Sequence, residues 1–441
     1  MTDSPPRGAA RTKRTPTTAA SRKYSAHRTN IQPVASTTTY PEVPIVMRFL
    51  LTTLPGTSHL LPLVPFAQAA LAAGHEVRVA CAGPALPAAV AAGLHALAVD
   101  DGASARPYDE IVRRIGETDM TEKLPPAELH AQFAAAFGET GNLMLGGLVE
   151  AIREWDADAV VYTPMAVAGL VAARATGKTA IVHGLGTRWP TYGPALAHLR
   201  SAATDLGVTE YAEADIEIDV SPPSLEAIHH RTTPAPTETY AGLIEHMRYL
   251  PYNGGGELPA WLRAPRTGRR RIAATLGSLT ATYGDGTLLR HIIKGAADLD
   301  VEVILMTGDA TLPGPLPDYV RPVPWLPLRA VLESCAAVVH HGGAGSMYAA
   351  LDAGVPQLVL PDRGTDSDTN AQLAVSRGVA LRLDTAQIAA TTIEQSLGAL
   401  LDSPSHRDAC AEVAQEMHGL PAPSTVVDRI STAIAAAKVG V

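Results

Sequence analysis

Short apolar runs alternate with longer segments of helical composition along the first half of the chain. Four of these runs are RFLLTT, HEVRVAC, DAVVYT and KTAIVH. The segment 60–73 between the first two is rich in leucine and alanine, and Gly74 follows it as glycine commonly follows the end of a helix. Strands that alternate with helices predict βαβ units and a mostly parallel sheet.

The second half repeats this pattern after a stretch rich in glycine and proline. RRIAATLGS, VEVILMTG, AAVVHH and QLVLP predict four more strands, and 406–438 predicts two or three helices. The break MRYLPYNGGGELPAWL cannot form the interior of a helix or of a central strand. We therefore expect two domains, at 47–246 and 266–441, joined by a linker at 247–265.

Composition narrows the class of protein. A chain of 441 residues exceeds the size at which one hydrophobic core keeps growing. None of its apolar stretches approaches the ~20 residues that span a bilayer. Cys81, Cys335 and Cys410 lack the spacing of a zinc site and favour a reducing, cytoplasmic location. The net charge of −9 argues against a nucleic-acid partner.

The first 46 residues differ from the rest. They contain seven Lys or Arg residues, two acidic residues and many Ser, Thr and Pro residues. We expect 1–46 to be a disordered basic tail, and synthesis to begin near Val46. A nucleic-acid-binding arm and a transit segment are the alternatives, although Tyr24 and Tyr40 are the only aromatic residues there for base stacking.

The stretch VVHHGGAGS combines a strand end with a glycine turn and a helix start. The apolar run delivers His340 and His341 to the carboxyl end of the predicted sheet. Glycines let the backbone turn sharply and approach a ligand, and Ser346 is expected to cap the next helix. Backbone N–H groups at a helix N-terminus form an anion site. Because adjacent residues on a strand point to opposite faces, we expect His340 to be structural and a metal site is disfavoured.

The first half contains a turn of the same form. TTLPGTSH is followed by a helix, as VVHHGGAGS is, so His59 takes a place comparable to that of His341. The dinucleotide fingerprint GxGxxG is absent from VVHHGGAGS. Ligands of open α/β sheets bind in crevices at the carboxyl ends of the strands. Two such domains facing each other predict a two-substrate enzyme with its active site in the cleft.

The order HHGGAGS, GVPQLVLP and DSDTNA resembles the C-terminal signature of the family 1 inverting glycosyltransferases. The likeness is greatest to the actinomycete enzymes that glycosylate antibiotic polyketides, and it runs from Met47 to the end. The resemblance implies an α/β GT-B fold, in which two Rossmann-like, doubly wound parallel-sheet domains face each other across a cleft.

The resemblance also implies a donor site. His341 and the backbone of Gly343, Ala344, Gly345 and Ser346 would hold the donor diphosphate. Gly277 and Ser278 would approach a phosphate from the other side.

Trp325 would stack on the nucleotide base, and the backbone of Leu326 would bond to the edge of that base. Packing in the core is the alternative for Trp325. Asp366 would bind the donor sugar, with Ser367 replacing the family's glutamine, which suggests a deoxysugar donor. The alternative is that Asp366 and Asp368 are solvated loop residues.

Two further positions bear on the identity of the donor nucleotide and on the catalytic general base. Ala349 stands where plant relatives have a ribose-binding glutamate, which favours a dTDP-sugar over a UDP-sugar. His59 resembles the family's general base, with Ser58 replacing a glycine. We expect a helix N-terminus to keep His59 neutral and able to accept a proton. A capping or packing role is the alternative.

Other residues near the predicted strand ends are weaker candidates for the active site. His183 ends a predicted strand and is expected to line the acceptor pocket, whereas His75 lies on the far side of a helix. Neither Asp119, in a polar loop, nor Thr163, at a strand end, is a convincing acid partner for the base.

The sequence thus predicts transfer of a deoxysugar from a dTDP- or UDP-sugar to a hydroxyl of a polyketide or aromatic natural product. We expect the acceptor to contact 124–154, predicted as one or two helices, and 184–245, predicted as irregular. No metal, further cofactor, nucleic acid or integral membrane contact is expected, and a homodimer is one state that the sequence allows. The alternatives are C-glycosylation of an aromatic ring, a nucleotide-sugar epimerase and a catalytically silent homologue that binds a partner.

Overall fold

The computed structural model describes residues 46–116, 124–209, 213–232, 242–264, 268–277, 286–308, 315–361, 365–384 and 387–439. Ile45–Val441 form one compact unit. The predicted basic tail therefore lies outside the described residues, apart from Val46.

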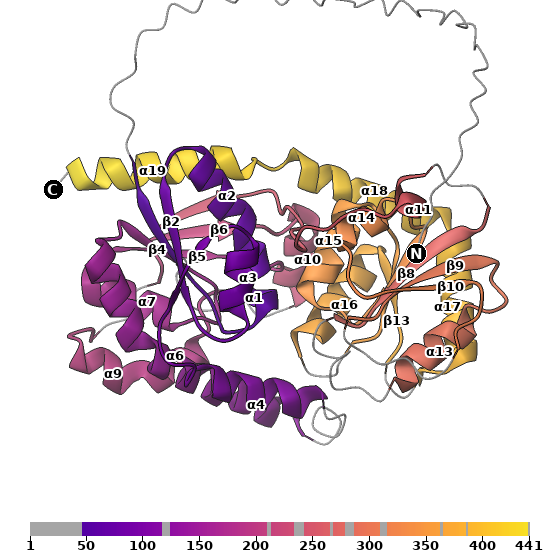
Figure 1. Cartoon of the computed structure of the whole chain (residues 1–441), viewed down its shortest axis with the longest axis horizontal. Helices are drawn as coiled ribbons and strands as arrows, with labels where there is room; N and C mark the ends of the chain where they lie inside the picture. Colours follow the sequence, from indigo (N-terminus) through magenta and orange to yellow (C-terminus); the bar gives the residue numbers. More distant parts are fainter. Residues whose placement is uncertain are drawn as a thin grey trace, which may run out of the picture. The chain divides into compact units, whose positions relative to one another are not determined.

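Two parallel sheets form the framework of this unit (Figure 1). The first has seven strands in the order β3 (His95–Ala98), β2 (Glu76–Cys81), β1 (Arg48–Thr52), β4 (Ala159–Tyr162), β5 (Thr179–His183), β6 (Ile216–Asp219) and β7 (Leu243–His246). The second has six strands in the order β10 (Val320–Val323), β9 (Val301–Met306), β8 (Arg270–Thr275), β11 (Ala337–His340), β12 (Gln357–Val359) and β13 (Ala380–Arg382). These two doubly wound sheets confirm the predicted fold class.

Helices connect the strands and cover the sheets. The first half contains α1 (Thr57–Leu60), η1 (Leu61–Leu63), α2 (Val64–Ala72), α3 (Ala85–Ala91), α4 (Ala105–Gly116), α6 (Pro126–Trp155), α7 (Ala168–Thr176), α8 (Gly193–Leu196), η2 (Ala197–Leu199), α9 (Arg200–Asp205) and α10 (Pro223–Thr232). The second half contains α11 (Ala260–Arg263), α13 (Thr287–Gly295), α14 (Leu328–Leu332), α15 (Ala344–Asp352), α16 (Asp366–Arg377), α17 (Ala390–Asp402), α18 (Pro404–Gly419) and α19 (Pro423–Val439).

The eight strands predicted from apolar runs are all present, and 124–154 forms the single helix α6. The prediction that 184–245 is irregular was wrong, because this segment contributes β6 and β7 to the first sheet. Strand β6 carries Glu217 and Asp219, which are both buried. Their charges hid the strand from a search for apolar runs.

The helix α19 belongs to the second half in sequence but packs on the first sheet. Its buried residues Ile430 and Val427 share a hydrophobic cluster with Phe49 of β1. Polar contacts join the same elements: His75 Nδ1 accepts the N–H of Met47, at 3.2 Å, so its Nε2 carries the proton and donates to Ser431 Oγ, at 3.0 Å. In Figure 1 this helix, in yellow, lies beside α2 and β2. The domain boundaries at 246 and 266 stay a prediction.

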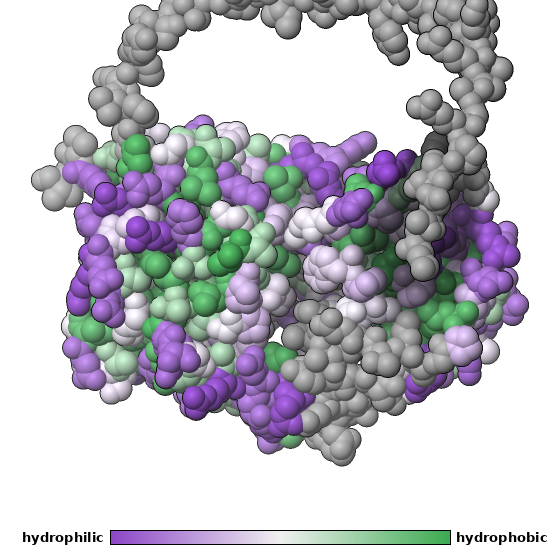
Figure 2. All heavy atoms as spheres, viewed as in Figure 1, coloured by the Kyte–Doolittle hydropathy of each residue, from purple (hydrophilic) through white to green (hydrophobic). Residues whose placement is uncertain are grey.

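The described helices include none that is long and apolar enough to cross a membrane. Figure 2 shows polar and apolar side chains interspersed on the face that carries α2 and α3. Leu71 and Val90 are among the exposed apolar side chains of these two helices. Singly exposed apolar residues are ordinary on a protein surface.

We expect Ile430→Ala to destabilise the first sheet, because it leaves a cavity between α19 and β1. Such a truncation costs about 2–5 kcal/mol of the free energy of unfolding at a buried site. Urea unfolding should show a lower midpoint, and hydrogen exchange should show faster exchange in β1 and β2. The control Lys438→Met removes only an exposed ion pair to Asp158 and should cost less than about 1 kcal/mol. Equal losses in both variants would contradict a packing role for α19.

Candidate active site

Each sheet reverses its winding direction beside its first strand. In the first sheet β1 lies between β2 and β4, and in the second β8 lies between β9 and β11. Connections on the two sides of such a point leave in opposite directions, which opens a crevice at the carboxyl ends of the strands. His59 follows β1, Gly277 follows β8 and His341 follows β11. The residues predicted from the two glycine turns therefore occupy the two switch points.

His340 fixes the turn after β11. Its ring is fully buried, and its Nδ1 accepts the N–H of Gly342 at 3.0 Å. Nε2 therefore carries the proton and donates to Gln357 Oε1 at 2.8 Å. Burial lowers the pKa of His340 to about 3, so the ring is neutral. Gly342 has a φ of 93°, which favours glycine. These contacts confirm the predicted structural role of His340.

His341 lies between the backbones of two glycines. A Cβ on Gly277 would come within 2.4 Å of its Cε1, and a Cβ on Gly343 within 2.4 Å of its Nε2. Neither position can therefore carry a side chain without displacing the ring. The Nδ1 of His341 is buried without a hydrogen-bond partner, and burial lowers its pKa to about 4. The ring is thus a neutral, half-buried imidazole whose Nδ1 lacks a protein partner.

The helix α15 begins beside this ring. Gly343 is its N-cap residue, with extended backbone, so the prediction that Ser346 caps the helix was wrong. The N–H groups of Ser346 and Met347 bond to the Gly343 carbonyl at 3.1 Å. The N–H groups of Ala344 and Gly345, in the first turn, have no intrahelical acceptor and add to the dipole at this helix end. The geometry is that of an anion site.

Trp325 is accessible at the surface rather than packed in the core. Its side chain is 53% exposed, which excludes the core-packing alternative. Gly254 of the predicted linker lies beside the indole, since a Cβ there would be 3.6 Å from Nε1. The following Leu326 is buried in a core cluster, so only its backbone can serve a ligand. Ser278 lies outside the described residues.

The segment predicted to bind the donor sugar starts α16. Asp366 is its first residue and is exposed. Ser367 is buried, and its hydroxyl shares a 2.6 Å hydrogen bond with Thr365. The expected loss of a sugar contact at Ser367 stays a prediction. Asp368 forms an ion pair with Arg382 at 2.5 Å and is therefore not a merely solvated acid.

His59 lies in the short helix α1 and is half-buried. Its ring meets the ring of Tyr108 edge-on, with centroids 5.7 Å apart. Its Nδ1 is buried without a hydrogen-bond partner, and burial lowers its pKa to about 4. Burial, rather than the predicted helix N-terminus, is thus what keeps this histidine neutral. Thr163 is buried with an unpartnered hydroxyl, and Asp119 lies outside the described residues.

Tyr108 was missed by sequence reasoning. A Cβ on Gly56 would lie 2.1 Å from its hydroxyl, so this residue presses on the turn that carries His59. Burial raises the pKa of Tyr108, and the charges of Asp109 and Asp366 raise it further. Asp366 belongs to α16, so a charge from the second half of the chain acts on Tyr108, whose ring contacts His59.

An aromatic cluster extends from Tyr108. Its ring stacks on Phe137 with centroids 6.3 Å apart, and Phe137 also contacts Phe133 at 5.7 Å and Tyr192 at 6.3 Å. Helices α4 and α6 and the segment before α8 supply these rings. Aromatic residues are only 5% of the chain, so their gathering between 108 and 192 was a signal available in the sequence.

His183 is buried at the end of β5. Its side chain is 1% exposed and packs edge-on against Phe66, with centroids 6.0 Å apart. Its Nδ1 donates to the Gly184 carbonyl at 2.7 Å. Its Nε2 is buried without a hydrogen-bond partner, as Nδ1 of His59 is, so a contact of His183 with the acceptor stays a prediction.

Comparisons with known proteins agree with this geometry. Two family models match, the N-terminal domain (residues 68–277) and the C-terminal domain (residues 290–433) of the erythromycin biosynthesis protein CIII-like family. The L-demethylnoviosyl transferase of Streptomyces niveus is 34% identical over 87% of this chain and 98% of its own length. The 3-alpha-mycarosylerythronolide B desosaminyl transferase of Saccharopolyspora erythraea is 31% identical over 86% of this chain and 97% of its own.

Solved structures show the same likeness. The glycosyltransferase SnogD from Streptomyces nogalater is 34% identical, with a TM-score of 0.72 over 88% of this chain and 99% of that chain. The spinosyn rhamnosyltransferase SpnG, solved with thymidine diphosphate, is 26% identical, with a TM-score of 0.72 over 87% of this chain and 100% of that chain. This chain is a glycosyltransferase of the GT-B fold and belongs to the erythromycin biosynthesis protein CIII-like family.

Proposed function

We propose that the enzyme transfers a deoxysugar from a dTDP-sugar to a hydroxyl group of a polyketide or aromatic natural product, with inversion. One observation carries this proposal. At each switch point lies a half-buried, neutral histidine whose Nδ1 has no protein partner, His59 after β1 and His341 after β11. A base on one side and an anion site on the other are the two functions that the transfer needs.

His59 is the proposed general base. It takes the proton of the acceptor hydroxyl while that oxygen attacks the anomeric carbon and the bond from this carbon to the diphosphate breaks. An imidazole with a pKa of about 4 is unprotonated near pH 7 and can accept this proton. Its edge-on contact with Tyr108 holds the ring orientation. The departing diphosphate gains negative charge, and His341 and the N-terminus of α15 stabilise this charge.

The proposal of a thymidine nucleotide donor is based on the solved relatives and not on the residue at position 349. Ala349 is fully buried in the core beneath α15, so its side chain does not face a ribose site. The glycosyltransferase VinC, 27% identical, and SpnG, 26% identical, were solved with thymidine diphosphate. The exposed Trp325 offers its indole face for stacking on a pyrimidine base.

The acceptor site is proposed at the aromatic cluster next to His59. Phe133, Phe137 and Tyr192 are partly exposed, and Phe137 stacks on the buried ring of Tyr108. Flat apolar acceptors gain both buried area and ring contacts at such a surface. One relative, 33% identical, is named as the aklavinone 7-beta-L-rhodosaminyltransferase of Streptomyces galilaeus.

The relatives also bear on the alternative reactions. The relatives do not favour an epimerase, a silent homologue or a C-glycosyltransferase, since those reported above are named as glycosyltransferases or sugar transferases. A reaction without a metal ion stays a prediction, and so does the cytoplasmic location. The three cysteines are free thiols, as that location would require.

His59→Ala should lower kcat by about 10²–10⁴-fold, since it removes the base. Binding of dTDP, measured by calorimetry, should not change. In the native enzyme kcat/KM should stay level from neutral pH downwards and fall only as pH approaches about 4, where His59 becomes protonated. The exposed His95 provides the control variant His95→Ala. Unchanged turnover, or an acid limb near pH 6.5, would contradict the assignment.

His341→Ala should weaken dTDP binding about ten- to hundredfold, because a hydrogen bond to a charged phosphate is lost. The KM of the donor should rise while the KM of the acceptor stays constant. Calorimetry with dTDP and steady-state kinetics measure these two effects. Wild-type affinity for dTDP would remove His341 from the donor site.

Titration of the enzyme with dTDP should raise the melting temperature more than titration with UDP at the same concentration. A ligand that binds the folded state more tightly stabilises it more by mass action. Differential scanning fluorimetry measures the two shifts. Equal shifts would contradict a preference for thymidine nucleotides.

A further inference from the structure

The segment after β5 in the first half of the chain contacts the start of α15 directly. Gly186 is buried, and a Cβ there would lie 2.9 Å from the ring of Tyr348 and 3.1 Å from the Cβ of Ala344. The backbone conformation at Gly186 does not require glycine, since its φ is not positive. The absence of a side chain at this position therefore serves the close approach to α15.

Thr187 continues this contact with hydrogen bonds. Its hydroxyl donates to Asn370 Oδ1 at 3.3 Å, and Asn370 Nδ2 donates to the carbonyl of Gly342 at 3.0 Å. The Tyr348 hydroxyl donates to Thr187 Oγ1 at 3.5 Å. All these side chains are buried. A chain of donors thus leads from the first half to the turn that carries His341.

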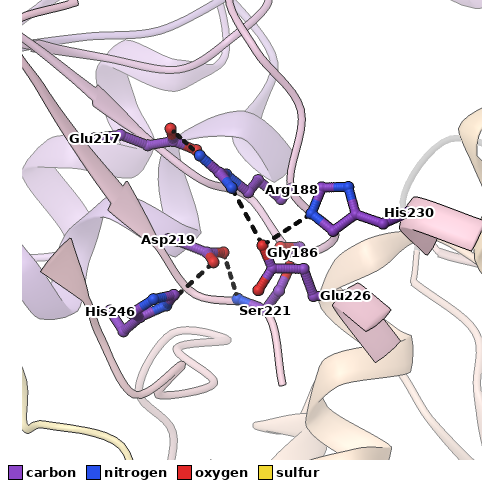
Figure 3. A network of polar contacts seen from close by, with 8 residues as sticks. All are labelled: Gly186, Arg188, Glu217, Asp219, Ser221, Glu226, His230 and His246. Atoms are coloured by element: carbon purple, nitrogen blue, oxygen red, sulfur yellow. Dashed lines mark hydrogen bonds and ion pairs between the residues drawn. The ribbon is translucent and has the colours of Figure 1, made fainter. Parts of the chain in front are cut away.

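The same segment is anchored firmly on its own sheet. Ser221 Oγ donates to the carbonyl of Gly186 at 3.0 Å, and its N–H donates to Asp219 Oδ1 at 2.9 Å (Figure 3). Arg188 binds both carboxylate oxygens of Glu217, at 2.6 and 2.8 Å. Most of these groups are buried, where such bonds are strongest.

The same hydrogen bonds and ion pairs explain a cluster of three side chains that could also ligate a cation. Asp219, Glu226 and His246 bring one ligand atom each within 4.8 Å of one another. In Figure 3, however, Asp219 points to His246 and Glu226 points to Arg188. These contacts are 3.2 Å long in both cases, and they explain the cluster as ion pairs that hold the segment.

We propose that Gly186 and Thr187 position the donor site from the opposite half of the chain: the buried path from Thr187 through Asn370 to Gly342 sets the turn that presents His341 to the diphosphate. The inference rests on the proposed role of His341. Thr187 is a positioning residue, since it acts through Asn370 and does not reach the donor itself. Donor affinity then depends on how closely the two halves of the chain meet.

The test measures dTDP binding to variants of the full chain by calorimetry, with donor and acceptor KM measured in parallel. Thr187→Val keeps the shape of the side chain but removes the hydroxyl, and should weaken dTDP binding about three- to tenfold, the value of one buried hydrogen bond. Thr187→Ser should restore near-native affinity. The acceptor KM should not change.

Thr191→Val is the matched control. Thr191 lies in the same segment and is equally buried, but its hydroxyl bonds to Tyr162 at 2.8 Å within the first half. This variant should bind dTDP like the native enzyme even if its melting temperature falls. An equal loss in Thr187→Val and Thr191→Val, or no loss in Thr187→Val, would overturn the inference.

A second pair tests the contact at Gly186 independently. Gly186→Ala forces a Cβ against Tyr348 and should also weaken dTDP binding, whereas Gly193→Ala meets no atom within 4 Å and should not. The variant His341→Ala distinguishes a failure of the proposed donor site from a failure of the positioning role. If it binds dTDP normally, the proposed donor site is wrong. If it loses affinity while Thr187→Val and Gly186→Ala do not, only the positioning role is wrong.

Discussion

The reversal of strand order beside β1 and beside β8 is the constraint on which the site depends. Because every strand pair is parallel, the carboxyl ends of neighbouring strands meet at one edge of each sheet. Only at the reversal do the connecting loops part and leave space for a ligand. The chain places His59 at the first reversal and His341 at the second. The chemistry of the enzyme is therefore a consequence of how its sheets are wound.

Three buried or half-buried histidines near the strand ends differ in the hydrogen bonds that their ring nitrogens make. The pKa values of His59, His340 and His341 are all lowered by desolvation, so all three rings are neutral. What separates them is the satisfaction of their nitrogens. Both nitrogens of His340 have protein partners, whereas Nδ1 of each of the other two has none. An unpartnered buried nitrogen is costly, and such a cost is expected where a substrate supplies the missing partner.

The sequence predicted the parts of the fold in which local and tertiary preferences agree. Apolar runs such as AAVVHH become central strands because both faces of a parallel sheet are buried. Strand β6 was missed because Glu217 and Asp219 are charged, and their burial is offset by partners far away in the sequence, such as Arg188 and His246. The cap of α15 was misplaced because the glycine at the helix start is required by a neighbouring ring rather than by the helix.

The packing of α19 on the first sheet has a consequence for the order in which the protein folds on the ribosome. The strands of the first sheet leave the ribosome long before α19 does, and until then the cluster around Phe49 and His75 lacks one wall. During synthesis the nascent first domain thus exposes an apolar surface while the second domain is still being translated. Its completion waits for Ser431, the partner of His75, which lies 356 residues downstream. The first sheet, although it is made first, is thus completed only after the C-terminal helix has been made.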